Sequence, residues 1–114
     1  MQKLYCIFFL LLLVGACKKE ETKTSFSEDC SGAAKSFAKD VSPVIQSNCA
    51  TSSSCHASGS NNGPGALTSY AQINADKSQI YSSVKSGSMP KNGSLSDAQK
   101  NNVLCWINSG AANN

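Results

Sequence analysis

The sequence has no arginine, a single histidine and a single tryptophan. All 10 positively charged side chains are therefore lysines, and they are scattered along the chain rather than gathered into a stripe. The formal net charge of +3 is modest for a chain of 114 residues. Nucleic-acid-binding domains usually concentrate Lys and Arg on one face. The composition therefore argues against nucleic acid as a partner.

The sequence also lacks an apolar run long enough to cross a membrane. Its longest apolar segment, residues 4–14, holds about a dozen residues, whereas a membrane-spanning helix needs about 20. Lys3 precedes this segment, and the small residues Gly15 and Ala16 follow it. This order is that of a secretory signal peptide. The sequence therefore predicts an exported protein whose apolar segment is removed.

Residues 14–17, Val-Gly-Ala-Cys, resemble the lipobox of bacterial lipoproteins. The resemblance implies that a signal peptide of residues 1–16 is cleaved and that the Cys17 thiol carries a diacylglyceryl anchor. We therefore expect a lipid-anchored protein of the cell envelope, at the outer membrane or cell surface, with a periplasm-facing site or an unlipidated exported protein as alternatives. Residues 18–21, Lys-Lys-Glu-Glu, are similar to the surface-export signal of some Bacteroidetes lipoproteins, and are equally typical of a solvated spacer.

Large apolar residues are scarce in the rest of the chain. From residue 31 onward there are only sixteen, counting Tyr, Trp and Met. This number supports one small domain, residues 36–114, and the polar residues 17–35 before it are predicted to be a lipidated N-terminus and flexible tether. A scaffold with so little apolar area usually needs disulfides, a metal or a bound cofactor.

The spacing of apolar residues predicts an all-α domain of about four short helices with long loops. One helix ends near Cys49, and two more follow the loop after it, the second of them stopped by Gly87. The last helix begins with a capping box at Ser96 and Gln99 and ends at Gly110. No segment has the alternating pattern of a strand.

Four cysteines remain for the domain, and outside the cytoplasm an even set predicts two disulfides. They are Cys30, Cys49, Cys55 and Cys105. In the last helix, residues 103, 104, 106 and 107 share an apolar arc of about 160° and Cys105 points away from its centre. We therefore predict that Cys105 faces outward and that its partner lies on a segment crossing the outside of this helix. Cys30, at the end of the tether, is the free candidate. Such a disulfide would stabilise the fold by about 4 kcal/mol in the chain-entropy estimate.

His56 is the only histidine, and Met89 is the only methionine once Met1 is removed. His56 follows Cys55 directly in one polar loop, and Met89 precedes Pro90 in another. A c-type haem needs a cysteine thioether, an adjacent histidine as proximal iron ligand and, in many proteins, a methionine as the sixth ligand. The two loops therefore supply the residue types that this cofactor requires.

Residues from about 41 to 112 resemble a monohaem cytochrome c domain of the kind found in Bacteroidetes and Planctomycetes lipoproteins. The matching pieces are VIQSNCATSSSCH, GPGAL, SMP and the closing LSDAQKNNVLCWINSGA. The resemblance implies a small cytochrome c-like fold of short helices wrapped around one haem. It implies an electron-transfer protein with redox partners in the cell envelope, rather than an enzyme with a small-molecule substrate.

Carried over residue by residue, the resemblance implies a thioether at Cys55 and iron ligation by His56 and Met89. The carbonyl of Pro64 is expected to accept a hydrogen bond from the other ring nitrogen of the histidine, and so to fix its tautomer. Trp106 is expected to pack near the haem edge or against the first helix.

The cysteine spacing departs from the usual C-x-x-C-H motif, because five residues separate Cys49 from Cys55. We expect Cys49 to form a second thioether; the alternative is that Cys55 forms the only one and Cys49 enters a disulfide. For the whole chain, the alternative is a haem-free lipoprotein with a binding or structural role, stabilised by Cys49–Cys55 and Cys30–Cys105 disulfides. A structural zinc site is disfavoured because adjacent Cys and His are awkward ligands for one tetrahedral ion.

Overall fold

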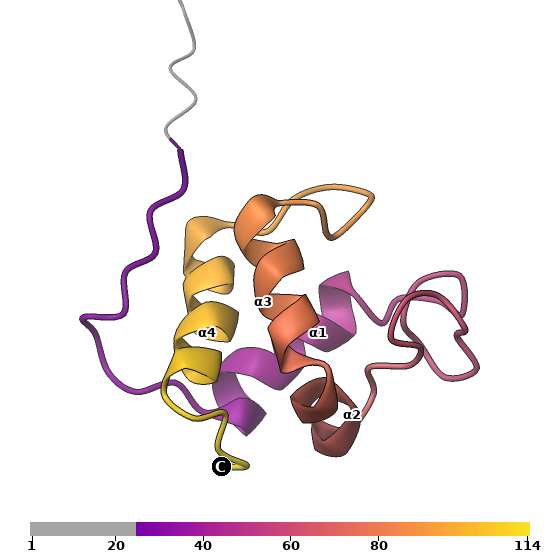
Figure 1. The fold of residues 1–114 in the computed structure, drawn as a ribbon, viewed down its shortest axis with the longest axis horizontal. Helices are drawn as coiled ribbons and strands as arrows, with labels where there is room; N and C mark the ends of the chain where they lie inside the picture. The colour runs from indigo at the N-terminus through magenta and orange to yellow at the C-terminus, as the bar shows by residue number, and fades with distance from the viewer. Residues whose placement is uncertain (1–24) are drawn as a thin grey trace, which may run out of the picture.

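The computed structural model describes residues 25–114, so the predicted signal peptide, Cys17 and the first part of the tether lie outside the described residues. The described part is helical and contains no strand, as the sequence predicts. Its elements, in chain order, are η1 (Phe37–Val41), α1 (Ser42–Asn48), α2 (Tyr70–Ala75), α3 (Lys77–Ser86) and α4 (Asp97–Asn108) (Figure 1). None of these helices is long and apolar enough to cross a membrane.

The predicted signals fix the ends of α3 and α4. Ser96 and Gln99 form the expected capping box: the Ser96 side chain accepts from the Gln99 amide, and the Gln99 side chain accepts from the Ser96 amide at 2.9 Å. Gly87 ends α3 with a positive φ of 74°, which residues with a Cβ adopt at a cost. A second capping box, at Ser69 and Gln72, starts α2. This second box was not among the predicted helix starts.

The first helical segment begins with a π-helical turn, which the spacing of apolar residues did not reveal. In η1 the amide of Val41 bonds the carbonyl of Ser36 at 3.3 Å, five residues back. Pro43 follows in the first turn of α1. Proline lacks an N–H, and its ring clashes with the carbonyl four residues before it in a regular α-helix. The wider turn therefore lies where a regular α-helix would meet this clash.

Trp106 is fully buried at the centre of the core. Its ring centroid lies 5.5 Å from that of Phe37 on η1 and 6.3 Å from that of Tyr70 on α2. Its indole N–H donates to the carbonyl of Ala112 at 2.8 Å, and the Tyr70 hydroxyl donates to that of Ala111 at 2.8 Å. Of its two expected positions, Trp106 takes the one against the first helical segment.

A disulfide joins Cys30 to Cys105, which is the predicted pairing; the Cα atoms are 5.4 Å apart. Cys105 lies outside the apolar core cluster, as its place off the apolar arc of α4 suggested. It is nevertheless only 7% exposed, because the chain around Cys30 covers it. The outward direction and the partner segment that crosses the outside of α4 are both as predicted.

The N-terminal segment packs against the helices from Phe26 onward, so this part of the predicted flexible tether is not free. Phe26 is partly buried against the core, and Glu28 is bonded to side chains of α3 and α4. Figure 1 shows the indigo segment running beside α4, on the side away from the loop that joins α1 to α2. The packed unit therefore begins before residue 36, where the sequence placed its start.

Candidate functional site

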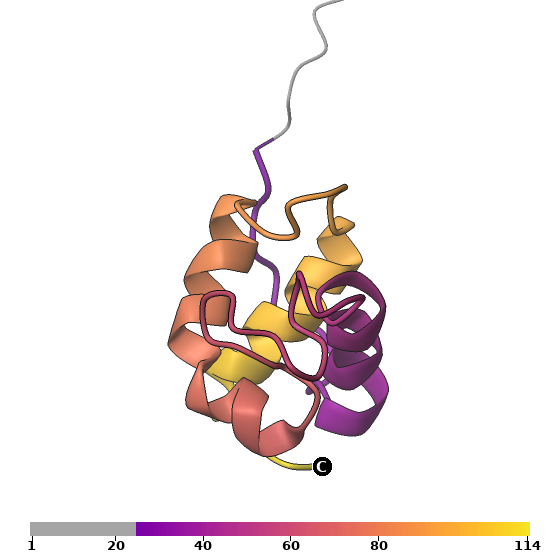
Figure 2. The same ribbon diagram turned by 90° about the vertical axis from the view of Figure 1, so that its right-hand side faces the viewer.

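A cleft of about 820 Å³ lies between α1, α3 and the two long loops of the chain. One loop joins α1 to α2 and the other joins α3 to α4. In Figure 2 the first of these loops faces the viewer, with α3 and α1 on either side and α4 behind. Cavities that bury small-molecule ligands commonly have volumes of about 300 to 1,000 Å³. The predicted cofactor residues all line this one cleft: Cys49, Cys55, His56, Pro64 and Met89.

His56 is held by its backbone and its ring. Its amide donates to the carbonyl of Cys49 at 3.0 Å, and its carbonyl accepts from the amide of Leu67 at 2.8 Å. Its ring Nδ1 lies 2.9 Å from the carbonyl oxygen of Gly65. Because a carbonyl only accepts, Nδ1 carries the proton and Nε2 keeps its lone pair. The imidazole, only 9% exposed in the wall of the cleft, is thus prepared as a ligand through Nε2.

The carbonyl that orients His56 belongs to Gly65 and not to Pro64, which corrects the prediction by one residue. Gly65 has a φ of +85°, and a Cβ there would lie 3.3 Å from the carbonyl oxygen of Ser60. The left-handed backbone of Gly65 is one that L side chains rarely adopt. Pro64 lines the cleft without making this hydrogen bond.

Side-chain to backbone hydrogen bonds give the polar loop after Cys49 a fixed course. The Ser60 hydroxyl donates to the carbonyl of Cys55, and the Asn62 amide donates to the carbonyl of Ser54 at 2.6 Å. Gly63 lies beside the ring, where an added Cβ would be 3.8 Å from His56 Cε1. The loop therefore holds Cys55 and His56 in place although it contributes no large apolar residue between Ala50 and Gly65.

Cys49 and Cys55 are both free thiols in the structure, and their environments differ. Cys49 is 9% exposed, and burial, with a smaller contribution from Cys55, raises its pKa to about 11. Hydrogen bonds from the side chains of Thr51 and Ser52 lower the pKa of Cys55, which is partly exposed. Cys55 is therefore the more reactive thiol of the two. The structure does not contain the Cys49–Cys55 disulfide of the haem-free alternative.

Met89 reaches the cleft because the chain turns back along α3 after Gly87. Its amide donates to the carbonyl of Ser83 at 3.3 Å, and the Ser88 hydroxyl donates to the same carbonyl at 3.4 Å. Lys91, two residues further on, also lines the cleft and is the one charged side chain among its described lining residues. A thioether, an imidazole and two thiols therefore share a cleft with this lysine and otherwise uncharged walls.

Residues of α1 and α3 that line the cleft were not among the predicted site residues. Ile45 of α1 and Ile80 and Val84 of α3 provide apolar surface, and Gln79 and Ser83 add polar groups on the same side of α3. The mixture of Gln and Ser with Ile and Val along α3 was visible in the sequence. The place of these residues in the cleft wall could not be predicted, because the pattern alone does not say which face of a short helix lines a cavity.

Comparison of the chain with protein-family models, curated proteins and solved structures finds no match.

Proposed function

We propose that this chain is a membrane-anchored electron-transfer protein that carries one covalently bound c-type haem, with His56 and Met89 as the axial iron ligands. The observation that carries the proposal is the convergence of Cys49, Cys55, His56 and Met89 on one cleft. These residues come from two loops separated by α2 and α3, and they include the only histidine of the chain.

The cleft fits such a cofactor in its size, its wall and its donor atoms. The volume of about 820 Å³ is near the upper end of the usual range for small-molecule sites. Ile45, Leu67, Ile80 and Val84 supply apolar surface for a flat macrocycle. Imidazole and methionine thioether are the axial pair of many c-type cytochromes, and thiols form the covalent attachment.

The residues of the chain have distinct roles in this proposal. His56 would bind iron through Nε2, with its tautomer fixed by the carbonyl of Gly65. Met89 would supply the second protein ligand to the iron, Cys55 would form a thioether, and Cys49, which lines the same cleft, would be the second attachment thiol. When bound, the haem supplies reversible one-electron redox chemistry, and methionine ligation raises its potential relative to two histidines.

The proposal also includes the membrane anchor on Cys17 after removal of residues 1–16. A lipid anchor keeps a small electron carrier at a high effective concentration near membrane-bound partners. We infer that those partners are redox proteins of the cell envelope. The resemblance to monohaem cytochrome c domains of bacterial lipoproteins supports this combination of a cofactor cleft and an anchor.

The test is to express the full chain with a cytochrome maturation system and to measure its intact mass and visible spectrum. The proposal predicts a covalent haem adduct and a sharp α band after reduction. The matched control is His56→Ala, which should lose the spectrum of the axially ligated iron. A wild-type chain that matures without any haem adduct would refute the cytochrome proposal, and the mass would separately show whether Cys17 carries lipid.

A further inference from the structure

The N-terminal segment of residues 26–31, which we call the strap, is bound to α3 and α4 by a partly buried carboxylate. The Glu28 side chain is only 14% exposed. It accepts hydrogen bonds from the Tyr81 hydroxyl at 2.8 Å, from the Lys85 ammonium at 3.1 Å and from the Asn108 amide. Tyr81 and Lys85 lie on α3 and Asn108 lies at the end of α4, so Glu28 joins two helices to the strap.

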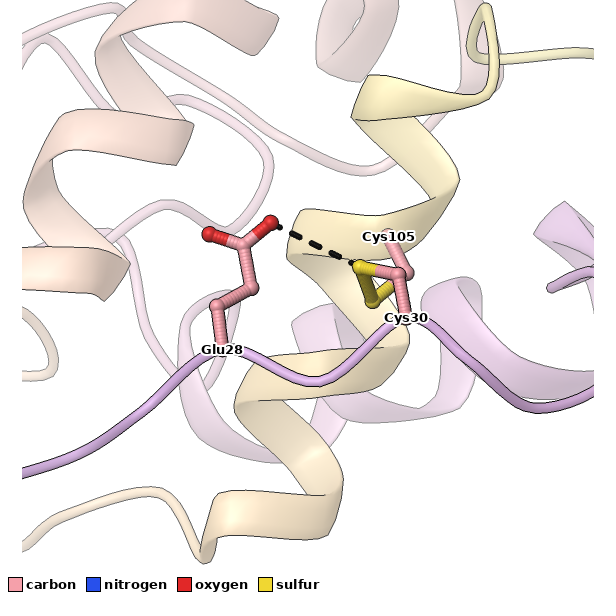
Figure 3. Close-up of side chains that lie close together, drawn as sticks. All are labelled: Glu28, Cys30 and Cys105. Carbon is pink, nitrogen blue, oxygen red and sulfur yellow. Dashed lines mark hydrogen bonds between the residues drawn. A yellow bond between two sulfur atoms is a disulfide. The ribbon is translucent and has the colours of Figure 1, made fainter.

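Covalent and polar contacts continue on both sides of Glu28. The Asp29 amide donates to the side chain of Asn101 at 3.1 Å, and Lys100 lies 4.7 Å from the ring centroid of Phe26. Figure 3 shows the Glu28 carboxylate beside the Cys30–Cys105 disulfide, 3.5 Å from the Cys30 sulfur. Neither sulfur carries a proton in the disulfide, so this approach is a contact rather than a hydrogen bond.

The strap and the cleft lie on different sides of α3. The strap contacts Tyr81 and Lys85, whereas Gln79, Ile80, Ser83 and Val84 line the cleft. At 100° per residue, these four residues lie about 60 to 160° around the helix from Tyr81. No residue of α4, the other helix under the strap, lines the cleft. The side of the domain that binds the strap is therefore turned away from the cleft.

We propose that the strap makes the α3–α4 face the membrane-side surface of the protein and directs the cleft away from the bilayer, towards a redox partner. This inference rests on the proposed anchor at Cys17. At about 3.5 Å per residue, the eight residues from Cys17 to Ser25 reach at most about 28 Å. Without the strap, the free chain would extend to Lys35, and its reach would be about 60 Å. The strap thus shortens the tether and sets the side on which it leaves the domain.

The first experiment measures hydrogen–deuterium exchange of the strap in the full, lipidated chain on phosphatidylcholine vesicles. The amide of Asp29, bonded to Asn101, should exchange at least tenfold more slowly in the wild type than in a Glu28→Gln, Cys30→Ser, Cys105→Ser variant. The matched control is Ser94→Ala, an exposed residue of the loop between α3 and α4, outside the strap. Equal exchange rates in the wild type and the triple variant would refute the claim that the strap is held against α3 and α4.

The second experiment measures orientation by lysine labelling with a water-soluble succinimidyl ester, on vesicles and in detergent. Lys91 on the cleft should be labelled equally in both, whereas Lys100 beside the strap should be labelled several-fold less on vesicles. In the triple variant this difference should shrink. Equal shielding of both lysines in the wild type would overturn the assignment of faces. If the triple variant fails to fold, Tyr81→Phe, which removes one donor to Glu28, serves for the comparison.

These outcomes are separate from those of the proposed function. Strap exchange and lysine labelling need no haem, and the intact mass of the same samples reports haem and lipid independently. A chain with a protected strap and no haem adduct would refute the cytochrome and leave the assignment of faces in place. A haem-loaded, lipidated chain with an exchanging strap would refute only the proposed orientation of the domain.

Discussion

At the scale of single residues, hydrogen bonds and burial fix the conformation and the protonation behaviour of the side chains in the cleft. His56 has its ring proton committed to Gly65, and Met89 is held in its loop by bonds to the end of α3. Cys49 is buried and Cys55 is partly exposed, so two chemically identical thiols have different pKa values. The surroundings of each thiol, rather than its residue type, therefore set its pKa.

Replacing Met89 by alanine should change the iron coordination of the matured protein. Loss of the thioether ligand should alter the visible spectrum and lower the potential, within the roughly 0.8 V range that axial ligands span. Redox titration with simultaneous spectroscopy measures both. The matched control is Ser94→Ala, an exposed residue of the same loop that does not line the cleft. An unchanged spectrum in Met89→Ala would reject this residue as a ligand.

Replacing Gly65 by alanine should destabilise the loop that orients His56. The φ of +85° is strained for alanine, by about 1 to 2 kcal/mol, and the added Cβ would also press on the carbonyl of Ser60. Gly59→Ala is a close control, because Gly59 has a φ of +81° with nothing within 4 Å of the added Cβ. In urea unfolding, Gly65→Ala should have a lower free energy of unfolding than Gly59→Ala. The reverse order would contradict a close contact between the added Cβ and the carbonyl of Ser60.

At the scale of secondary structure, the helices are short and depend on their ends. An isolated helix of fewer than about 12 residues is marginal in water, and α2, with 6 residues, is far below that length. Capping boxes at Ser69 and Ser96 satisfy amide groups that the first turns leave without partners. The ends of α2 and α4 are thus defined locally, while their packing depends on the core.

Replacing the capping residue Ser96 by alanine should lower the free energy of unfolding by about 1 kcal/mol. The loss comes from the hydrogen bond that the Ser96 hydroxyl accepts from the Gln99 amide. Ser78→Ala is the comparison, since Ser78 is exposed within α3 and alanine is the better helix former there. Urea unfolding measures the free energy of unfolding of both variants, and the dependence of that free energy on urea concentration should be unchanged. Equal stability of the two variants would show that the box contributes little.

At the scale of the whole molecule, the sparse core is supplemented by a covalent link between distant parts of the chain. The Cys30–Cys105 disulfide closes a sequence separation of 75 residues. It connects the N-terminal segment to α4, whose buried residues include Trp106 at the centre of the core. The same region receives the Glu28 contacts, so the covalent link and the polar contacts act on one surface.

Replacing Cys30 and Cys105 together by serine should lower the free energy of unfolding by about 2 to 4 kcal/mol. The reason is that the unfolded chain regains the conformational freedom that the closed loop removes. Urea denaturation of the wild type with and without reductant, beside the double variant, measures the change. If the reduced wild type has the same free energy of unfolding as the oxidised wild type, the disulfide does not stabilise the fold by restricting the unfolded chain.

Glu28 should make the stability depend on pH. Its hydrogen bond from Tyr81, and then those from Lys85 and Asn108, lower the pKa of this carboxyl despite an opposing effect of burial. A lowered pKa in the folded state means that the stabilisation is complete above the ordinary glutamate pKa of about 4.3 and is lost as the pH falls through the folded-state value. The stability difference between the wild type and Glu28→Gln should therefore narrow on acidification below about pH 4; a constant difference down to pH 2 would contradict this.

Much of the site could be predicted from the sequence because its residue types are rare in this chain. A single histidine beside a cysteine, and a single methionine after processing, left few candidates for the cleft. The carbonyl partner of His56 was misplaced by one residue, since only the backbone at Gly65 decides which carbonyl points at the ring. The sequence predicts a flexible tether where the strap lies. A polar segment whose contacts are single side-chain bonds has no periodic pattern of apolar residues that would reveal its packing.

The sequence by itself determined the helical class, the ends of α3 and α4 and the place of Cys105 off the apolar arc of α4, because capping, glycine stops and the apolar arc of one helix are local properties. Only the tertiary structure decided that two distant loops share one cleft, that Trp106 packs away from it and that Glu28 joins the strap to α3 and α4. These are relations between segments far apart in the chain. They depend on how several short helices bury their apolar faces together, which no single segment encodes.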